Sequence, residues 1–251
     1  MLLAIDIGNT NITLGAFEND QISQTMRLST PHSLTVDEAV MPLERFIGSN
    51  GGEIARTVLA SVVPRLSSVY AGALRKLALP DPMIVGPEIK LPIRIEIDRP
   101  DQVGADRIAN AVAGFLMFGG PAVIVDFGTA TTFDVINSAG AYIGGVIIPG
   151  PQTAMADLAR RAARLFQVPI EPPQHVIGRT TTQALQAGFF HGTVGQVDYI
   201  IEKVIAESRE TSHHIIATGG LAGRIEAHSR FIQKVAPNLT LHGLRLIAES
   251  G

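Results

Sequence analysis

One short pattern occurs twice in the chain and constrains its fold more than any other feature. Each copy reads as an apolar run, an aspartate, a bulky apolar residue, a glycine and then small polar residues that open a second strand. The first copy spans Leu2–Thr13 and the second spans Ala122–Thr132, with their carboxylates at Asp6 and Asp126. Each copy predicts a strand–turn–strand hairpin. Two such hairpins predict duplicated half-domains that face each other across a cleft.

The turn of each hairpin suits a phosphate group. Gly8 and Asn9 tolerate positive φ, and small side chains let backbone N–H groups approach an anion closely. Asp6 cannot bind phosphate directly, but its carboxylate can hold a hydrated Mg²⁺ that does. An ordinary hairpin with a solvated aspartate is the alternative for the first copy alone. The second copy favours a nucleotide clamp, because it supplies Asp126 and Thr129 on the other side.

Composition and charge exclude several classes of protein. The 251 residues are 46% hydrophobic and 17% charged, which indicates a well-packed chain with one large or two small domains. A net charge of −3 without a long basic run argues against a dedicated nucleic-acid partner. The absence of cysteine excludes disulfides and cysteine nucleophiles. The chain opens directly into a strand and no apolar run reaches membrane-spanning length, so we expect a cytoplasmic protein without membrane association.

Strands are followed by helices in both halves, which indicates an α/β architecture. We expect strands within residues 2–29 (three strands), 54–63, 83–85, 93–97, 122–126, 130–137, 141–148 and 215–217. We expect a first helix that begins at Thr35, is capped by Thr35 and Glu38, and ends at residues 49–52. Further helices are expected over 64–79, from Gly104, over 153–166, over 180–208 and around 244–248. The helix over 180–208 is expected to have an interruption near Gly192. Gly119-Gly120-Pro121 predicts a boundary between domains 1–118 and 119–251.

The sharpest remaining polar cluster is Gly104-Ala105-Asp106-Arg107. The chain has neither a P-loop nor a Rossmann glycine motif, so a nucleotide must be held in another way. The cluster opens a predicted helix, where free N–H groups and the helix dipole favour anions. Arg107 adds a fork for a carboxylate or phosphate, and Asp106 can accept a proton from an attacking hydroxyl. A capping aspartate beside a surface arginine is the structural alternative.

Three other stretches have both a structural and a functional interpretation. Gly178–Thr182 fits the N-cap of a long helix or a contact with a polar substrate. Ala217–Gly220 fits a turn that approaches a nucleoside or a tight packing corner, and Gly144–Gly150 fits a close backbone approach or a bend. No histidines have metal-ligand spacing, and we expect His213 and His214 to be solvated. The remaining histidines are isolated and are expected to have structural or surface roles: His32, His175, His191, His228 and His242.

Over essentially its whole length the chain resembles the type III pantothenate kinases, which belong to the acetate-kinase, sugar-kinase and actin-like superfamily. The resemblance is carried by pieces in family order: Asp6–Asn11, Ser61–Pro64, Gly104–Arg107, Asp126–Thr132 and Gly219–Ala222. It implies an α/β fold with two similar actin-like (ribonuclease H-like) domains, in which mixed sheets are flanked by helices and a cleft lies between the domains.

The resemblance also implies a reaction, the ATP-dependent phosphorylation of pantothenate to 4′-phosphopantothenate, with Asp106 as general base. The implied pantothenate contacts are Gly104, Ala105, Asp106, Arg107 and Thr181. The implied ATP contacts are Asp6, Gly8, Asn9, Thr10, Asn11, Thr13 and Thr129. Asp6 would hold Mg²⁺ through water, and Asp126 would bind a monovalent cation, K⁺ or NH4⁺. Members of the family are homodimers with the substrate site near the interface.

Two positions depart from the family pattern. Ile97 stands where many members carry a tyrosine that lines the pantothenate pocket, and Thr180 replaces the usual asparagine. The first departure leaves open a kinase of the same fold that uses another hydroxylated acid. A non-catalytic nucleotide-binding accessory protein is a further alternative. The carboxylates of Asp6, Asp106 and Asp126 argue against it, because a binding module has no need of a base beside an anion pocket.

Overall fold

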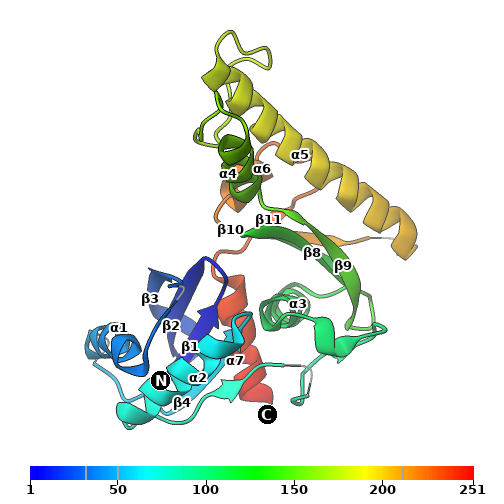
Figure 1. Ribbon diagram of the computed structural model, residues 1–251. Coiled ribbons are helices and arrows are strands. Elements are labelled where there is room, and N and C mark those ends of the chain that lie inside the picture. Colours follow the sequence, from blue (N-terminus) through cyan, green and yellow to red (C-terminus); the bar gives the residue numbers. More distant parts are fainter. Residues whose placement is uncertain (32, 50, 87, 211) are drawn as a thin grey trace. The chain divides into compact units, whose positions relative to one another are not determined.

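The computed structural model (Figure 1) describes residues 1–31, 33–49, 51–86, 88–210 and 212–251, which form two compact units. The first unit comprises Met1–Ala113 and Leu239–Gly251, and the second comprises Gly114–Asn238. The C-terminal helix α7 (Leu239–Ser250) belongs to the first unit because it packs against three of that unit's strands. The domain boundary expected at residues 118 and 119 stays a prediction. The expected role of His32 and the flanks at Asn50 and Pro87 lie outside the described residues.

The first unit is built on a mixed sheet. Its strands are β1 (Leu2–Ile7), β2 (Asn11–Glu18), β3 (Gln21–Ser29), β4 (Arg56–Ser61) and β5 (Met83–Ile84). They lie in the order β3-β2-β1-β4-β5. Strand β2 is antiparallel to both β1 and β3, whereas β4 is parallel to both β1 and β5. The other elements that begin in this unit are α1 (Val36–Gly48), α2 (Pro64–Lys76), β6 (Arg94–Ile95), a short 3₁₀ helix (Pro100–Gln102) and α3 (Ala105–Phe118).

Local sequence determines where the first two helices begin. Thr35 caps α1, because its side chain accepts a hydrogen bond from the Glu38 N–H while the Glu38 carboxylate accepts one from the Thr35 N–H at 2.8 Å. Pro64 opens α2 at a position where its missing N–H costs nothing. Both predicted starts are therefore confirmed. The apolar faces of α1 and α2 contribute buried residues to one core with the strands: Leu3, Ile5, Leu14, Phe46 and Tyr70.

The second unit repeats the topology of the first. Its strands are β7 (Ala122–Phe127), β8 (Ala130–Ile136), β9 (Ala141–Pro149), β10 (His214–Gly219) and β11 (Lys234–Val235). Within the unit they lie in the order β11-β10-β7-β8-β9, which matches β5-β4-β1-β2-β3 element by element. Its helices are α4 (Pro151–Arg161), α5 (Thr181–Ser208) and α6 (Ala222–Glu226). Two mixed sheets flanked by helices confirm the predicted fold class.

The predicted interruption of the long helix is wrong. Helix α5 runs unbroken from Thr181 to Ser208, as the yellow ribbon in Figure 1 shows. Gly192 is exposed and lies between Phe190 and Val197, which are both buried in the core of the second unit. Packing on both sides of a glycine outweighs its weak helix propensity.

The strand expected over 93–97 shrinks to Arg94–Ile95, and the short elements α6 and β11 were not predicted. Pairs and single turns of residues are too short for a periodic sequence signal. Across the described ranges, no helix is both long enough and apolar enough to cross a membrane.

Candidate functional site

The turn of the first hairpin is held on both sides by hydrogen bonds. The Gly8 N–H donates to the Asn11 carbonyl at 2.9 Å. Thr30, just beyond β3, donates from its N–H to the Thr10 carbonyl at 2.9 Å and from its hydroxyl to the Gly8 carbonyl at 2.7 Å. Asn9 and Thr10 themselves are exposed. The turn is thus a preformed loop whose tip faces solvent, as a phosphate-binding turn requires.

Asp6 is the only polar residue of β1 and lies opposite Thr13 in the β1–β2 register. Both residues are half-buried just before the turn. Within the described ranges no three His, Asp or Glu side chains gather into a metal cluster. A single carboxylate fits Mg²⁺ bound through waters and substrate phosphates, which is the way Mg²⁺ is usually held at phosphate sites.

The second hairpin has a turn that is one residue shorter. Here the Gly128 N–H donates to the Ala130 carbonyl at 3.0 Å, the bond that corresponds to Gly8 and Asn11. The carbonyl of Thr129 accepts two hydrogen bonds, from the Gly150 N–H at 3.0 Å and from the Thr153 hydroxyl at 2.7 Å. The start of α4 therefore fixes Thr129 in place.

Asp126 lies beside a glycine at the end of β10. Gly219 has φ +88°, and a Cβ on it would lie 2.6 Å from both Asp126 Oδ1 and the Phe127 carbonyl oxygen. The next residue, Gly220, donates its N–H to the Phe127 carbonyl at 3.1 Å. The structure thus supports the packing-corner interpretation of Ala217–Gly220. The absent Cβ lets the chain pack closely against a carboxylate and a carbonyl oxygen. Oxygen ligands of these two kinds suit a hard cation.

Asp106 occupies the first turn of α3, as predicted. Its Oδ1 accepts a hydrogen bond from the Arg107 N–H at 2.9 Å. Burial raises the pKa of the Asp106 carboxyl, against the lowering effects of the Arg107 N–H and the Arg107 charge. Gly104 makes room for this carboxylate, because a Cβ on Gly104 would contact Asp106 Oδ1. A partly desolvated carboxylate with a raised pKa suits a general base.

Thr181 is the first residue of α5 and is exposed. The capping role falls to Thr180, whose hydroxyl accepts a hydrogen bond from the Gln183 N–H at 3.2 Å. The Gln183 side chain in turn accepts from the Arg179 N–H at 2.9 Å. The N-cap interpretation of this stretch is therefore confirmed for Thr180, whereas the Thr181 hydroxyl stands outside the cap.

The predicted site residues divide between the units. The first unit holds the hairpin turn and Gly104–Arg107. The turn at Ser61–Pro64 lies next to both of them. Val62 donates its N–H to the Ile7 carbonyl at 3.0 Å, and its Cγ1 lies 3.6 Å from the position of a Cβ on Gly104. Sequence reasoning identified Ser61–Pro64 as a family piece without giving it a role. The second unit holds three predicted residues: Asp126, Thr129 and Thr181.

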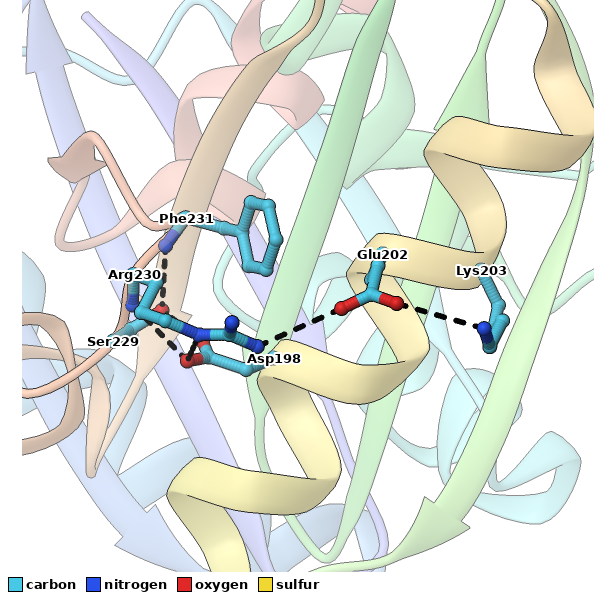
Figure 2. A network of polar contacts seen from close by, with 6 residues as sticks. All are labelled: Asp198, Glu202, Lys203, Ser229, Arg230 and Phe231. Atoms are coloured by element: carbon cyan, nitrogen blue, oxygen red, sulfur yellow. Dashed lines mark hydrogen bonds and ion pairs between the residues drawn. The ribbon is translucent and has the colours of Figure 1, made fainter.

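Another polar cluster in the second unit has a structural role (Figure 2). Asp198 on α5 is 5% exposed and accepts hydrogen bonds from the Ser229 hydroxyl at 2.6 Å and from the Arg230 backbone and guanidinium. Glu202 lies 3.7 Å from the same guanidinium. The cluster fixes the segment between α6 and β11 onto α5.

A second correction concerns His213, which was predicted to be solvated. It is buried, and its Nε2 lies 2.9 Å from the Ser208 hydroxyl.

Known proteins resemble the chain in sequence and in fold. A family profile described as type III pantothenate kinase matches residues 2–203. The chain is 43% identical to a type III pantothenate kinase from Moorella thermoacetica and 44% identical to one from Pelobacter propionicus, over 99% of both chains in each case. Its fold is similar to that of a ROK family glucokinase from Streptomyces griseus, with a TM-score of 0.57, 11% identity and 99% coverage of both chains.

Proposed function

Because the chain belongs to the type III pantothenate kinase family, we propose that it uses ATP to phosphorylate pantothenate, the first step of coenzyme A synthesis. The observation that carries the proposal is the partly desolvated carboxylate of Asp106. The turn at Ser61–Pro64 lies next to both this part of the chain and the first hairpin, whose preformed turn suits an anion. A kinase of this kind needs a base for the acceptor hydroxyl and a cradle for the donor phosphates. Asp106 and the first hairpin turn are the proposed candidates for these two roles.

In the proposed reaction, Asp106 accepts the proton of the pantothenate hydroxyl. The hydroxyl oxygen then forms a bond to the γ-phosphorus of ATP as the bond to the β-phosphate oxygen breaks and ADP leaves. The raised pKa of Asp106 makes it a stronger base than an ordinary carboxylate. Gly104, Ala105, Arg107 and Thr181 are the proposed pantothenate contacts, and Arg107 can meet the substrate carboxylate.

The proposed ATP contacts are residues of the two hairpins: Asp6, Gly8, Asn9, Thr10, Asn11, Thr13 and Thr129. Asp6 would hold Mg²⁺ through water, and Asp126 would hold K⁺ or NH4⁺ beside Gly219. These cations, when bound, offset the negative charge of the phosphate groups. The support is the exposed tip of the first turn and the close approach of Gly219 to the Asp126 carboxylate and the Phe127 carbonyl oxygen.

A coupled assay of ADP release with purified protein, ATP and pantothenate tests the proposed reaction. We expect pantothenate-dependent turnover and a product that is heavier by one phosphate in mass spectrometry. Absence of turnover at millimolar ATP would contradict the proposal. Turnover with another hydroxylated acid but not with pantothenate would favour the alternative acceptor that Ile97 leaves open. Replacing K⁺ with tetramethylammonium should depress the rate, and an indifferent rate removes Asp126 from the cation role.

We also propose a homodimer, and the surface of α5 supports it. Among residues 181–199, the exposed side chains include no Asp, Glu, Lys or Arg, and Tyr199 is 60% exposed. A cavity of about 360 Å³ with mainly apolar walls lies between α4 and α5. Depletion of charge is typical of interface cores. Sedimentation velocity should give twice the chain mass, and a monomer would contradict the proposal.

The cytoplasm is the proposed location, because ATP is abundant there.

A further inference from the structure

The same backbone hydrogen bond occurs once in each unit, next to each hairpin. In the first unit the N–H of Val62 donates to the Ile7 carbonyl at 3.0 Å. In the second unit the N–H of Gly220 donates to the Phe127 carbonyl at 3.1 Å. Ile7 and Phe127 each come directly after the hairpin carboxylate. The internal repeat therefore places Val62 and Gly220 at equivalent positions.

The two equivalent corners carry different side chains. In the second unit, glycine at position 219 lets the chain approach Asp126, since a Cβ there would lie 2.6 Å from Oδ1. In the first unit, Ser61 and Val62 take the corresponding positions and both carry side chains. The Ser61 hydroxyl accepts a hydrogen bond from the Val63 N–H at 3.0 Å, which stabilises the turn. The equivalent corners thus carry two glycines in the second unit and two larger residues in the first.

The side chain of Val62 lies near Gly104, the residue that makes room for the Asp106 carboxylate. Val62 Cγ1 lies 3.6 Å from the position that a Cβ on Gly104 would take, so it borders the space beside this glycine. Asp106 Oδ1 borders the same space, because that Cβ would contact it. Gly104 also accepts the first backbone bond of α3, from the Ile108 N–H at 3.0 Å. Val62 and the Asp106 carboxylate therefore border one space, beside the glycine at which α3 begins.

We propose that Val62 is a positioning residue that fixes the distance between Asp106 and the phosphate-binding turn at Gly8–Asn11. Its N–H is bonded to the hairpin at the Ile7 carbonyl, and its side chain borders the space beside Gly104 that the Asp106 carboxylate also borders. A shorter side chain leaves space beside Gly104, which gives the Asp106 carboxylate freedom to move and contact with water. The inference rests on the proposed role of Asp106 as the base. Misplacement of a reacting group by about 1 Å costs up to roughly 100-fold in rate.

The test compares Val62→Ala with Val62→Thr, which keeps the branched shape, and with Val63→Ala as a matched control. Val63 lies in the same turn, but its side chain packs against the core of the first unit. We expect Val62→Ala to lower kcat roughly 10- to 100-fold with little change in KM for ATP. Val62→Thr and Val63→Ala should stay within about 3-fold of the wild-type kcat, since both keep a branched side chain at position 62 beside Gly104.

A pH profile separates positioning from a general loss of structure. Water admitted beside Asp106 should lower its pKa towards the ordinary value, so the acid limb of kcat/KM for pantothenate should move to lower pH in Val62→Ala only. Wild-type kcat and an unmoved acid limb in Val62→Ala would overturn the inference, provided that Asp106→Asn abolishes turnover in the same assay. If Asp106→Asn keeps turnover, the base role fails, and the positioning role fails with it.

Discussion

Gly219 lies against the carboxylate of Asp126, so close that a Cβ on Gly219 would sit 2.6 Å from Asp126 Oδ1. The Phe127 carbonyl oxygen is equally near that position. This relationship depends on two properties of glycine, its missing Cβ and its tolerance of φ +88°. Gly220, one residue further, has no atom within 4 Å of its own Cβ position. The two neighbouring glycines thus have very different structural constraints.

Gly219→Ala should destabilise the protein by roughly 2–5 kcal/mol, because it adds both backbone strain and overlap with fixed oxygens. Urea unfolding followed by circular dichroism measures the change. Gly220→Ala is the matched control and should change the free energy of unfolding by less than about 1 kcal/mol. The relationship with Asp126 would be disproved if the two variants unfolded at the same urea concentration. Where Gly219→Ala still folds, we expect its rate to respond less to K⁺ than that of the wild type.

Asp106→Asn should reduce kcat by at least about 100-fold while ATP binding stays nearly intact, because only the proton acceptor is lost. Steady-state kinetics and ATP titration followed by calorimetry check the two parts. In the wild type, the acid limb of kcat/KM should lie above the ordinary carboxyl pKa, since burial raises the pKa of Asp106. Near-normal turnover in the variant would remove Asp106 from the base role.

Asp106→Asn should raise the stability of the folded protein although it lowers kcat. A raised carboxyl pKa means that the folded state binds the Asp106 proton more tightly than the unfolded state does. Any stability from this group is therefore present at low pH and is lost as the pH rises through the raised pKa. Removing the charge should make Asp106→Asn more stable than the wild type at pH 7, with a smaller difference at acidic pH. Thermal unfolding at several pH values measures this trend.

The sequence predicted the repeat because its signal is local. Apolar runs that end in Asp-x-Gly occur at both sites, and the structure forms hairpins with matching registers, Asp6 opposite Thr13 and Asp126 opposite Thr132. Thr35 could likewise be assigned as a cap from its spacing to Glu38 alone. In each case the residues that determine the structure lie within a few positions of each other.

The missed features depend on contacts between distant segments. Thr30 hydrogen-bonds the turn at Gly8, and Gly150 supports Thr129, but neither contact has a local pattern. His213 is buried where the Gln233 side chain, from a later segment, donates a hydrogen bond to its carbonyl at 3.1 Å. Packing against the core likewise carried α5 through Gly192, where propensity favoured a break. Tertiary contacts of this kind can be read only from coordinates.

The Asp198 cluster predicts a sharp contrast between two carboxylates on one helix. Asp198→Ala removes the acceptor for the Ser229 hydroxyl and for the Arg230 N–H, and should cost roughly 2–4 kcal/mol of unfolding free energy. Glu202→Ala removes two exposed ion-pair contacts, at 3.7 Å to the Arg230 guanidinium and at 3.5 Å to Lys203 Nζ, and should cost less than about 1 kcal/mol. Urea unfolding of both variants makes the comparison. Equal losses would show that the buried hydrogen bonds of Asp198 contribute nothing beyond an exposed ion pair.

Helix α7 gives the first unit a sensitivity to mild acid. Burial lowers the pKa of His242, and so does the Arg245 charge one turn along the helix. The His242 ring meets Phe17 edge-on at 5.5 Å, and Arg245 is itself paired with Asp20 and Glu249. A lowered histidine pKa means that the unfolded state binds the proton first as the pH falls. The protein should therefore lose stability as the pH falls below about 6.5.

His242→Gln should lessen this loss, because glutamine keeps a similar polar shape but does not take up a proton. The measurement is the difference in melting temperature between pH 7.5 and pH 5.5 for the wild type and the variant. His213 needs the matched variant His213→Gln, since burial also lowers the pKa of that ring. Each variant should remove part of the acid sensitivity, and the double variant should remove more than either alone. An unchanged difference in His242→Gln would show that the acid sensitivity comes from other groups.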